Sequence, residues 1–352
     1  MEQKSYKNKW NCNFNKISLK TYLIILFGII TCNLSAQDVS VSMPFFSSQF
    51  LSPANVGSSL YGSRVQGNLK SQFTGNSNLF NTIIAGWDTK LNNKEYEEKN
   101  HLGLGFQIMS DQLLGGILQT NYLTTNFAYH LNLNQNRTNT LAMGMGLSVA
   151  QTSYDQTKLT FGDMYNSNGT QISTVSPNEI LNKNPTSYAV NTGIVFSRHA
   201  EETFFQLGVN SFYYSMPELT GALNKLTEAT EMRFNAFLNL EKYIAGDFTI
   251  LVHGSYDIKG ENSFYFFSGA FGVPLNKDLD YPKRFYLGTS IRQNIALTPY
   301  IAVMNTRYNF AISYDLYNSG ATASQIKQNG FELSFSHFFS RRKKEIFRSL
   351  LD

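Results

Sequence analysis

Apolar and polar residues alternate at every second position along most of this chain. In residues 64–73, Val65, Leu69 and Phe73 share one face of an extended strand, and polar residues dominate the other face. Successive side chains leave a strand on opposite faces, so such a segment has one apolar side and one wet side. The pattern predicts β-strands that separate water from an oily phase or core.

Fourteen stretches carry this pattern, and most have about the length that a tilted strand needs to cross a bilayer. Average strands of soluble proteins are shorter. Beyond residue 36, the chain has no run of roughly twenty apolar residues, which a membrane-spanning helix would require. The predicted strands are residues 64–73, 79–88, 101–110, 117–131, 139–150, 187–198, 203–214, 232–241, 247–257, 263–273, 284–292, 295–304, 306–315 and 329–339.

Two all-β architectures fit these strands. The first is a transmembrane antiparallel β-barrel of about 14 strands. The second is a soluble β-sandwich, whose apolar faces would turn toward a core. Loop lengths favour the barrel, because the longest predicted connections all follow odd-numbered strands, whereas the turns after strands 6, 8 and 12 are short. The three longest predicted connections are 151–186, 215–231 and 316–328. An even strand number then predicts periplasmic N- and C-termini and extracellular long loops.

The first 36 residues have the layout of a secretory signal peptide. An apolar run over 22–30 is followed by the small residues Ser35 and Ala36, which predicts cleavage after Ala36. Cys32 leaves open a lipoprotein alternative, although Thr31 before it is larger than the small residue expected there. The basic residues that precede the apolar run are Lys4, Lys7, Lys9, Lys16 and Lys20.

Removal of this leader changes the charge and the thiol content. The leader holds five of the 29 basic residues and one of the 25 acidic residues, so the remaining chain has 24 of each and the net charge of +4 disappears. A neutral chain gives no support to nucleic-acid binding. Both cysteines, Cys12 and Cys32, lie in the leader, so the remaining chain cannot form disulfides.

The chain divides into a signal peptide (1–36), an N-terminal segment (37–63), a barrel (64–340) and a basic C-terminal tail (341–352). The N-terminal segment is rich in aromatic and other apolar residues, so we expect it to plug or cap the barrel; the alternative is a disordered periplasmic tail. The basic run at 341–344 could dock a periplasmic or peptidoglycan-bound component, touch acidic headgroups, or remain solvated.

Three charged residues are candidates for a site at the barrel rim. By alternation, Arg292, Asp315 and Glu332 face the lumen near one end of their strands. Charges inside a barrel wall tend to pair, so we expect an ion pair of Arg292 with Glu332 or Asp315. Such a pair either anchors a partner's segment that enters the barrel or only stabilises the rim.

The sequence carries no signal for catalysis, and we expect no cofactor or metal. The five histidines are scattered without ligand spacing, and neither a GxSxG motif nor a cysteine nucleophile follows the leader. Gly103 and Gly105, like Gly144 and Gly146, are predicted to be strand glycines at thin places in the wall rather than phosphate-binding loops.

Five short motifs resemble those of one known family when their order and spacing are taken together. They are residues 50–58, 205–211 with Pro217 downstream, 287–292, 311–315 and 330–334. In this arrangement the chain resembles the PorP/SprF family of outer-membrane proteins of the type IX secretion system. The resemblance implies export or surface anchoring of cargo proteins. The implied partners are a secreted or surface cargo protein with a C-terminal secretion signal, possible periplasmic type IX components, and outer-membrane lipids.

Two other functions remain open from the residues alone. A barrel of this size can leave a lumen, so the protein could be a passive porin or transporter for small or hydrophobic solutes. The sandwich reading would make it a secreted adhesin. Conductance, cargo co-purification and extraction from membranes distinguish the three.

Overall fold

The computed structural model describes residues 41–59, 62–74, 77–91, 100–136, 138–155, 158–160, 162–173, 185–200, 202–215, 232–244, 248–260, 262–276, 283–293, 296–305, 307–317 and 328–339. The predicted signal peptide and basic tail lie outside these residues.

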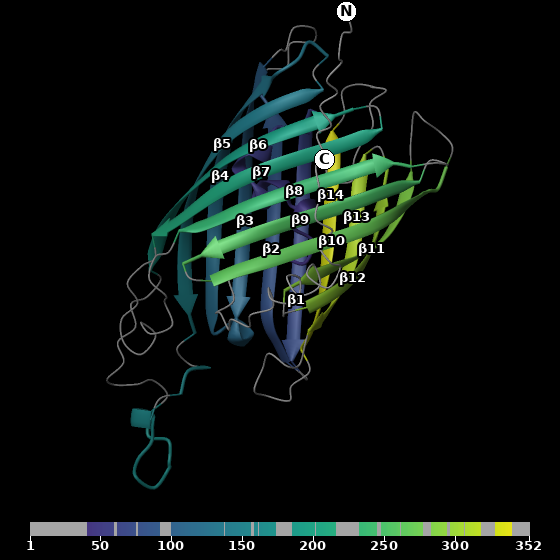
Figure 1. Cartoon of the computed structure of the whole chain (residues 1–352). Coiled ribbons are helices and arrows are strands. Elements are labelled where there is room, and N and C mark those ends of the chain that lie inside the picture. The colour runs from purple at the N-terminus through teal and green to yellow at the C-terminus, as the bar shows by residue number, and fades with distance from the viewer. Residues whose placement is uncertain are drawn as a thin grey trace, which may run out of the picture. The chain divides into compact units, whose positions relative to one another are not determined.

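Fourteen antiparallel strands form one closed barrel, in which each strand pairs with the next and β1 pairs with β14 (Figure 1). A sandwich would need two separate sheets, so the sandwich alternative is wrong. The strands are β1 (Ser63–Thr74), β2 (Ser77–Lys90), β3 (Asn100–Leu113), β4 (Leu118–Asn132), β5 (Asn139–Tyr154), β6 (Thr186–His199), β7 (Thr203–Ser215), β8 (Arg233–Tyr243), β9 (Thr249–Lys259), β10 (Asn262–Pro274), β11 (Arg284–Arg292), β12 (Ala296–Met304), β13 (Tyr308–Tyr317) and β14 (Gln328–Phe339).

The predicted strands are confirmed in number and order, with ends that differ by a few residues. The largest difference is in β5, which continues to Tyr154 instead of ending at residue 150. Its last residues extend the ladder with the start of β4, where Leu118 lies opposite Tyr154. Pairing with β4 therefore extends β5 beyond the residues in which apolar and polar side chains alternate clearly.

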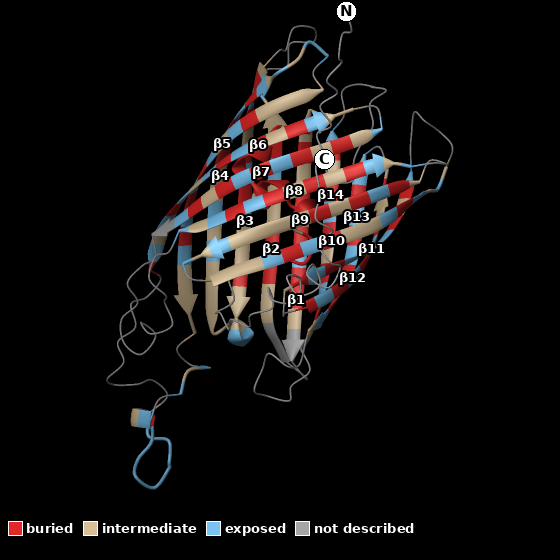
Figure 2. Ribbon diagram, viewed as in Figure 1, coloured by how far each residue is buried: buried red, intermediate tan, exposed pale blue. Residues whose placement is uncertain are grey.

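The wall is apolar outside, whereas its inner face carries both polar and apolar residues. Along β5, Met143, Met145 and Leu147 are exposed on the outer face, whereas Ser148 and Ala150 are buried. Figure 2 shows the same alternation of exposed and buried residues along neighbouring strands. This is the arrangement of a barrel in lipid, where the outer side chains contact hydrocarbon and the inner ones do not.

The two ends of the barrel differ in their connections. The three longest, 155–185, 216–232 and 318–327, follow the odd-numbered strands β5, β7 and β13. We call the end where odd-numbered strands finish the long-loop end and the opposite end the short-turn end. The turns after β6, β8 and β12 at the short-turn end are short, as predicted.

Within residues 41–59, three short helices precede β1: η1 (Pro44–Phe46), α2 (Ser48–Leu51) and η2 (Pro53–Asn55). Prolines begin η1 and η2, because a fixed φ and a missing N–H suit a first helical position. The Ser52 side chain caps η2 by accepting from the Ala54 amide, and Gly57 (φ 72°) turns the chain toward β1. No described helix is long and apolar enough to cross a membrane.

Candidate functional site

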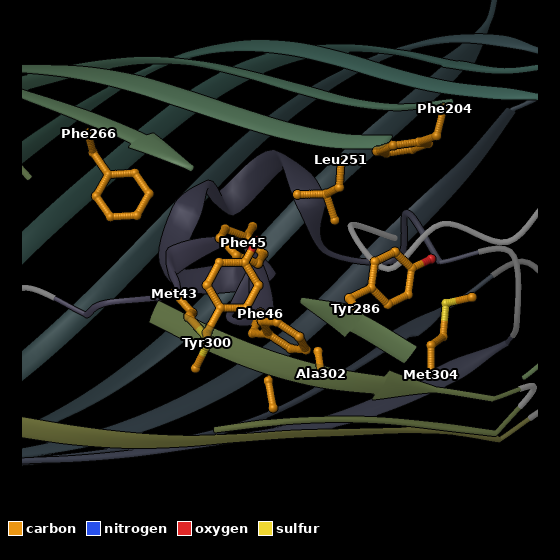
Figure 3. Packing of buried hydrophobic residues seen from close by; sticks show 11 residues of the cluster. Met43, Phe45, Phe46, Phe204, Leu251, Phe266, Tyr286, Tyr300, Ala302 and Met304 are labelled. Atoms are coloured by element: carbon orange, nitrogen blue, oxygen red, sulfur yellow. The ribbon is translucent and has the colours of Figure 1, made fainter. Parts of the chain in front are cut away.

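Residues 41–57, here called the lumen segment, lie inside the barrel. Side chains from strands around the wall bind its main chain: Arg292 of β11 at Val41, Asn210 of β7 at Leu51, and His130 of β4 at Val56. Because these strands stand on different sides of a closed barrel, only a segment within the lumen can reach all of them. Figure 3 shows part of this packing.

Four buried charged residues, Lys70, Arg292, Asp315 and Glu332, gather around the start of the lumen segment and are called the mouth cluster. The Arg292 Nη2 donates to the Val41 carbonyl oxygen at 3.0 Å. The Glu332 carboxylate accepts from the Ser42 amide at 2.5 Å and from the Met43 amide at 3.0 Å. Asp315 accepts from the Ser42 hydroxyl, so the three residues predicted from the sequence come together around residues 41–43.

The partner of Asp315 differs from the expected one. Its Oδ2 lies 3.2 Å from the Lys70 Nζ, and the prediction had paired Arg292 with Asp315 or Glu332. Arg292 binds the Val41 carbonyl because the lumen segment lies within its reach. A role of these residues in holding a partner remains a prediction.

Neutral donors complete the coordination of both carboxylates. Asp315 accepts from the hydroxyls of Ser42 and Thr298, each at 2.7 Å, and Glu332 accepts from the Asn68 amide at 2.7 Å. A buried carboxylate is tolerated when several donors replace its water. The mouth cluster is therefore a satisfied network that fixes residues 41–43.

A second group, the short-turn seat, consists of Arg64, Asp88, His101 and His130 on β1 to β4. Arg64 and Asp88 form a two-point ion pair, with Nε–Oδ1 at 3.0 Å and Nη2–Oδ2 at 3.2 Å. The same Nη2 donates to the Asn55 carbonyl at 3.1 Å, and Asp88 accepts from the Gly57 amide at 2.9 Å. One ion pair thus binds both a donor and an acceptor of the lumen segment.

The two histidines of the seat bind adjacent carbonyl groups. The Nε2 atoms of His101 and His130 lie 3.0 Å from the Gly57 oxygen and 2.7 Å from the Val56 oxygen. Since a carbonyl only accepts, each Nε2 carries a proton and donates it. The rings stack with centroids 4.4 Å apart, because the register places the two residues opposite each other on β3 and β4. Among the described residues, no three His, Cys, Asp or Glu side chains are arranged so that they could hold a metal ion.

Glycines on the wall let the lumen segment approach closely. A Cβ on Gly103 would lie 2.0 Å from the Val56 oxygen, and one on Gly144 would lie 2.4 Å from the Ala54 nitrogen. On Gly193 it would lie 2.6 Å from the Ser52 Oγ. Gly103 and Gly144, predicted to lie at thin places in the wall, let the backbone of the lumen segment pack against the wall. The recurrence of glycine on neighbouring strands is the sequence signal for this contact.

The opposite side of the lumen is apolar. Phe45 and Phe46 pack against aromatic and aliphatic side chains of β7 and β9 to β13 (Figure 3). The Phe45 ring lies 5.9 Å from the Tyr300 ring and 5.4 Å from the His253 ring. The buried cluster comprises Met43, Phe45, Phe46, Phe204, Leu251, Phe266, Tyr286, Tyr300, Ala302, Met304 and Ala311.

A cavity beside the lumen segment is too small for a solute. It has a volume of about 10 Å³ and is lined in part by Phe45, Leu51, Phe204 and Gln206. That volume holds about one water molecule. Gln206 also donates to the Asn55 side chain at 3.1 Å, so this wall is joined to the segment.

Comparison with solved structures finds barrels of low sequence identity. The toluene transporter TodX of Pseudomonas putida is 10% identical with a TM-score of 0.49, and the match covers 87% of this chain and 96% of that one. A FadL homologue of Pseudomonas aeruginosa is 9% identical with a TM-score of 0.49, and the match covers 84% and 94%. No curated protein matches the chain. At these identities and TM-scores, the matches support no conclusion beyond the barrel that the strand pairing itself shows.

The family comparison covers most of the chain. Residues 33–337 match the family described as "Type IX secretion system membrane protein PorP/SprF". A closed antiparallel barrel with an apolar exterior is the form that a membrane protein takes in the outer membrane. This chain therefore belongs to the PorP/SprF family of type IX secretion system membrane proteins.

Proposed function

We propose that this protein supports export or cell-surface anchoring of type IX cargo by binding a cargo segment at its long-loop end. The cargo would be a secreted or surface protein with a C-terminal secretion signal. The family match supports a role in secretion, and the filled lumen supports binding at the mouth.

The observation that carries this proposal is the occupation of the lumen by residues 41–57. Their main chain is bound at both ends, and Phe45 and Phe46 are buried against the wall. A partner that enters would have to displace these contacts. We therefore place the binding surface at the mouth of the barrel.

The proposed orientation places the long-loop end outside the cell. Both the start of β1 and the end of β14 lie at the short-turn end, which would face the periplasm. Periplasmic type IX components would then meet the short turns. The basic run at 341–344 would follow β14 on that side.

Deletion of residues 158–173, in the loop after β5, tests this function. We expect the detergent-solubilised variant to lose most co-purifying surface cargo, with less cargo displayed on cells. Heat-modifiable migration on a gel reports whether the barrel still assembles. A matched control shortens the turn at 133–138, at the opposite end, and should keep the cargo.

Cargo that still co-purifies after all three long loops are shortened would contradict this proposal. The alternative, a passive transporter for small or hydrophobic solutes, predicts steady conductance or solute uptake in liposomes. Because the lumen segment occupies part of the lumen, we expect neither from the intact chain.

A further inference from the structure

The mouth cluster binds main-chain atoms of the lumen segment. The Glu332 carboxylate accepts from the amides of Ser42 and Met43, and Arg292 donates to the Val41 carbonyl oxygen. Every residue has a main-chain carbonyl, and every residue except proline has an amide N–H. The same three contacts are therefore open to any segment of this backbone conformation that has no proline at the positions of residues 42 and 43.

Two side chains of the lumen segment make the site more selective. The Ser42 hydroxyl donates to Asp315 at 2.7 Å, and the Met43 side chain is buried in the apolar cluster. Ser290 donates to the Ser42 carbonyl oxygen at 3.4 Å. A site with these contacts favours a hydroxyl-bearing residue followed by an apolar residue.

The charges of the mouth cluster cancel. Lys70 and Arg292 are cationic, Asp315 and Glu332 are anionic, and all four are buried. Residues 41–43, which the cluster binds, carry no charge. A terminal carboxylate or a phosphate in their place would leave an unpaired negative charge in a buried site, which is costly. The cluster therefore suits the interior of a peptide chain and not its charged end.

Residues 41–43 are held in a way that allows another segment to take their place. They are not part of a strand, and the cluster holds them with side chains. When they leave, Glu332 and Asp315 lose hydrogen-bond donors, which is costly for buried carboxylates. The vacated cluster thus favours a segment that offers the same donors. Arg292 is the last residue of β11, so the cluster lies close to the long-loop end.

We propose that the mouth cluster is a peptide-binding site, in which residues 41–43 are the resident ligand and an uncharged internal segment of the cargo replaces them. The replacing segment has a hydroxyl-bearing residue followed by an apolar residue, with no proline at either position. That the partner is the cargo rests on the proposed function. The chemistry of the site rests on the contacts of residues 41–43.

A peptide added to the full-length protein tests the site. The probe is an amidated Gly-Val-Ser-Met-Gly peptide with an uncharged fluorophore on its amino end, so it presents the residues found at 41–43 without charged ends. Ser42→Pro vacates the site, because proline removes the amide and the hydroxyl that hold residue 42. Fluorescence anisotropy in detergent gives the dissociation constant, and heat-modifiable migration shows that each variant is folded.

We expect the Ser42→Pro variant to bind the probe at least about tenfold more tightly than the parent chain, in which the linked residues 41–43 compete at a high effective concentration. Addition of Glu332→Gln to the Ser42→Pro variant should weaken binding about tenfold, since the charged acceptor of the two amides is lost. A probe with alanine in place of serine, or with a free carboxyl end, should also bind more weakly.

Glu241→Gln, added to the Ser42→Pro variant, is the matched control. Glu241 is also a buried lumen carboxylate, but it accepts from Tyr286 near the short-turn end, so its replacement should leave the affinity for the probe unchanged. Equal affinities of the parent chain and the Ser42→Pro variant, or no loss of affinity from Glu332→Gln, would overturn the inference.

The inference and the proposed function can fail separately. If the probe binds as expected but cargo still co-purifies after the long loops are shortened, the peptide-binding site stands and the proposed function fails. If shortening the loops removes the cargo while the Ser42→Pro variant does not bind the probe, the proposed function stands and this inference fails.

Discussion

The two ends of the lumen segment are held by different means. At the short-turn seat, four side chains from four neighbouring strands bind the main chain of residues 55–57, and wall glycines bring the backbones into contact. At the mouth cluster, Glu332 accepts from both backbone amides of residues 42 and 43, Arg292 donates to the Val41 carbonyl, and Asp315 accepts from the Ser42 hydroxyl. Both ends are hydrogen-bonded, but close approach of backbone to wall glycines is a feature of the seat.

This difference indicates which end can move. Local opening is easiest where side-chain hydrogen bonds alone must break, and the seat also has backbone packed against wall glycines, so the segment should release from the mouth cluster before it releases from the seat. Such an order would let a partner at the long-loop end exchange with residues 41–43 while residues 52–57 keep the lumen closed. The predictions below compare the two ends.

The largest effect is expected from Arg64→Met in the seat. Both members of the Arg64–Asp88 pair are almost completely buried, with 0% and 1% exposure, so the substitution leaves an unpaired buried carboxylate. Loss of one partner from such a pair costs about 3–5 kcal/mol. Urea unfolding of the barrel in phospholipid vesicles measures the loss.

Arg233→Met is the matched control for this change. Arg233 and Asp257 also pair across neighbouring strands, but their side chains are 21% and 15% exposed. Removing a pair that water still reaches should cost less than about 1 kcal/mol. Equal losses for the two variants would mean that the seat is not specially dependent on its ion pair.

Much of the barrel could be predicted from the sequence because alternation is a local signal. Each strand shows its two faces within ten or so residues, so the number and order of the strands follow from the sequence. Alternation also placed Arg292, Asp315 and Glu332 on the lumen face. The aromatic residues of 37–63 indicated that this segment would fold.

The seat could not be predicted in the same way. His130 and Val56 are 74 positions apart, and they meet because the barrel closes around the segment. His101 and His130 become neighbours only through the register of β3 and β4. The partner of Arg292 depends on where the Val41 backbone lies, which alternation does not encode. Contacts inside the lumen depend on how the barrel closes around the segment, and the residue pattern of a single strand does not reveal this.

A smaller effect is expected from Gly103→Ala in the seat. The new Cβ would lie 2.0 Å from the Val56 oxygen and 2.7 Å from its carbonyl carbon, so backbone must shift. Overpacking of this kind costs about 1–3 kcal/mol. At the other end, Gly330→Ala should cost less, because its Cβ would lie 3.1 Å from the Ser71 oxygen and 3.4 Å from Asp315.

Gly269→Ala controls for the general effect of alanine in a strand. Its nearest atom, the Leu251 oxygen, would be 3.9 Å from the new Cβ. Stability should stay the same or rise by up to about 1 kcal/mol, since alanine loses less chain entropy than glycine. Comparable losses in the free energy of unfolding for the Gly103→Ala and Gly330→Ala variants would contradict the proposed difference in packing between the seat and the mouth cluster.

The smallest change in stability is expected from Glu332→Gln, which keeps the shape of the mouth cluster and removes one negative charge. Glutamine keeps one acceptor oxygen, so one of the Ser42 and Met43 amides loses its charge-assisted acceptor, worth about 1.5 kcal/mol, while the barrel stays folded. We read the release with two buried probes, Ser42→Cys at the mouth and Ser59→Cys beside the seat. Because about 1.4 kcal/mol corresponds to tenfold, Glu332→Gln should raise thiol reactivity at residue 42 by about tenfold. Reactivity at residue 59 should be unchanged. An equal rise in reactivity at residues 42 and 59 would show that the segment opens as one unit and that its two ends do not release separately.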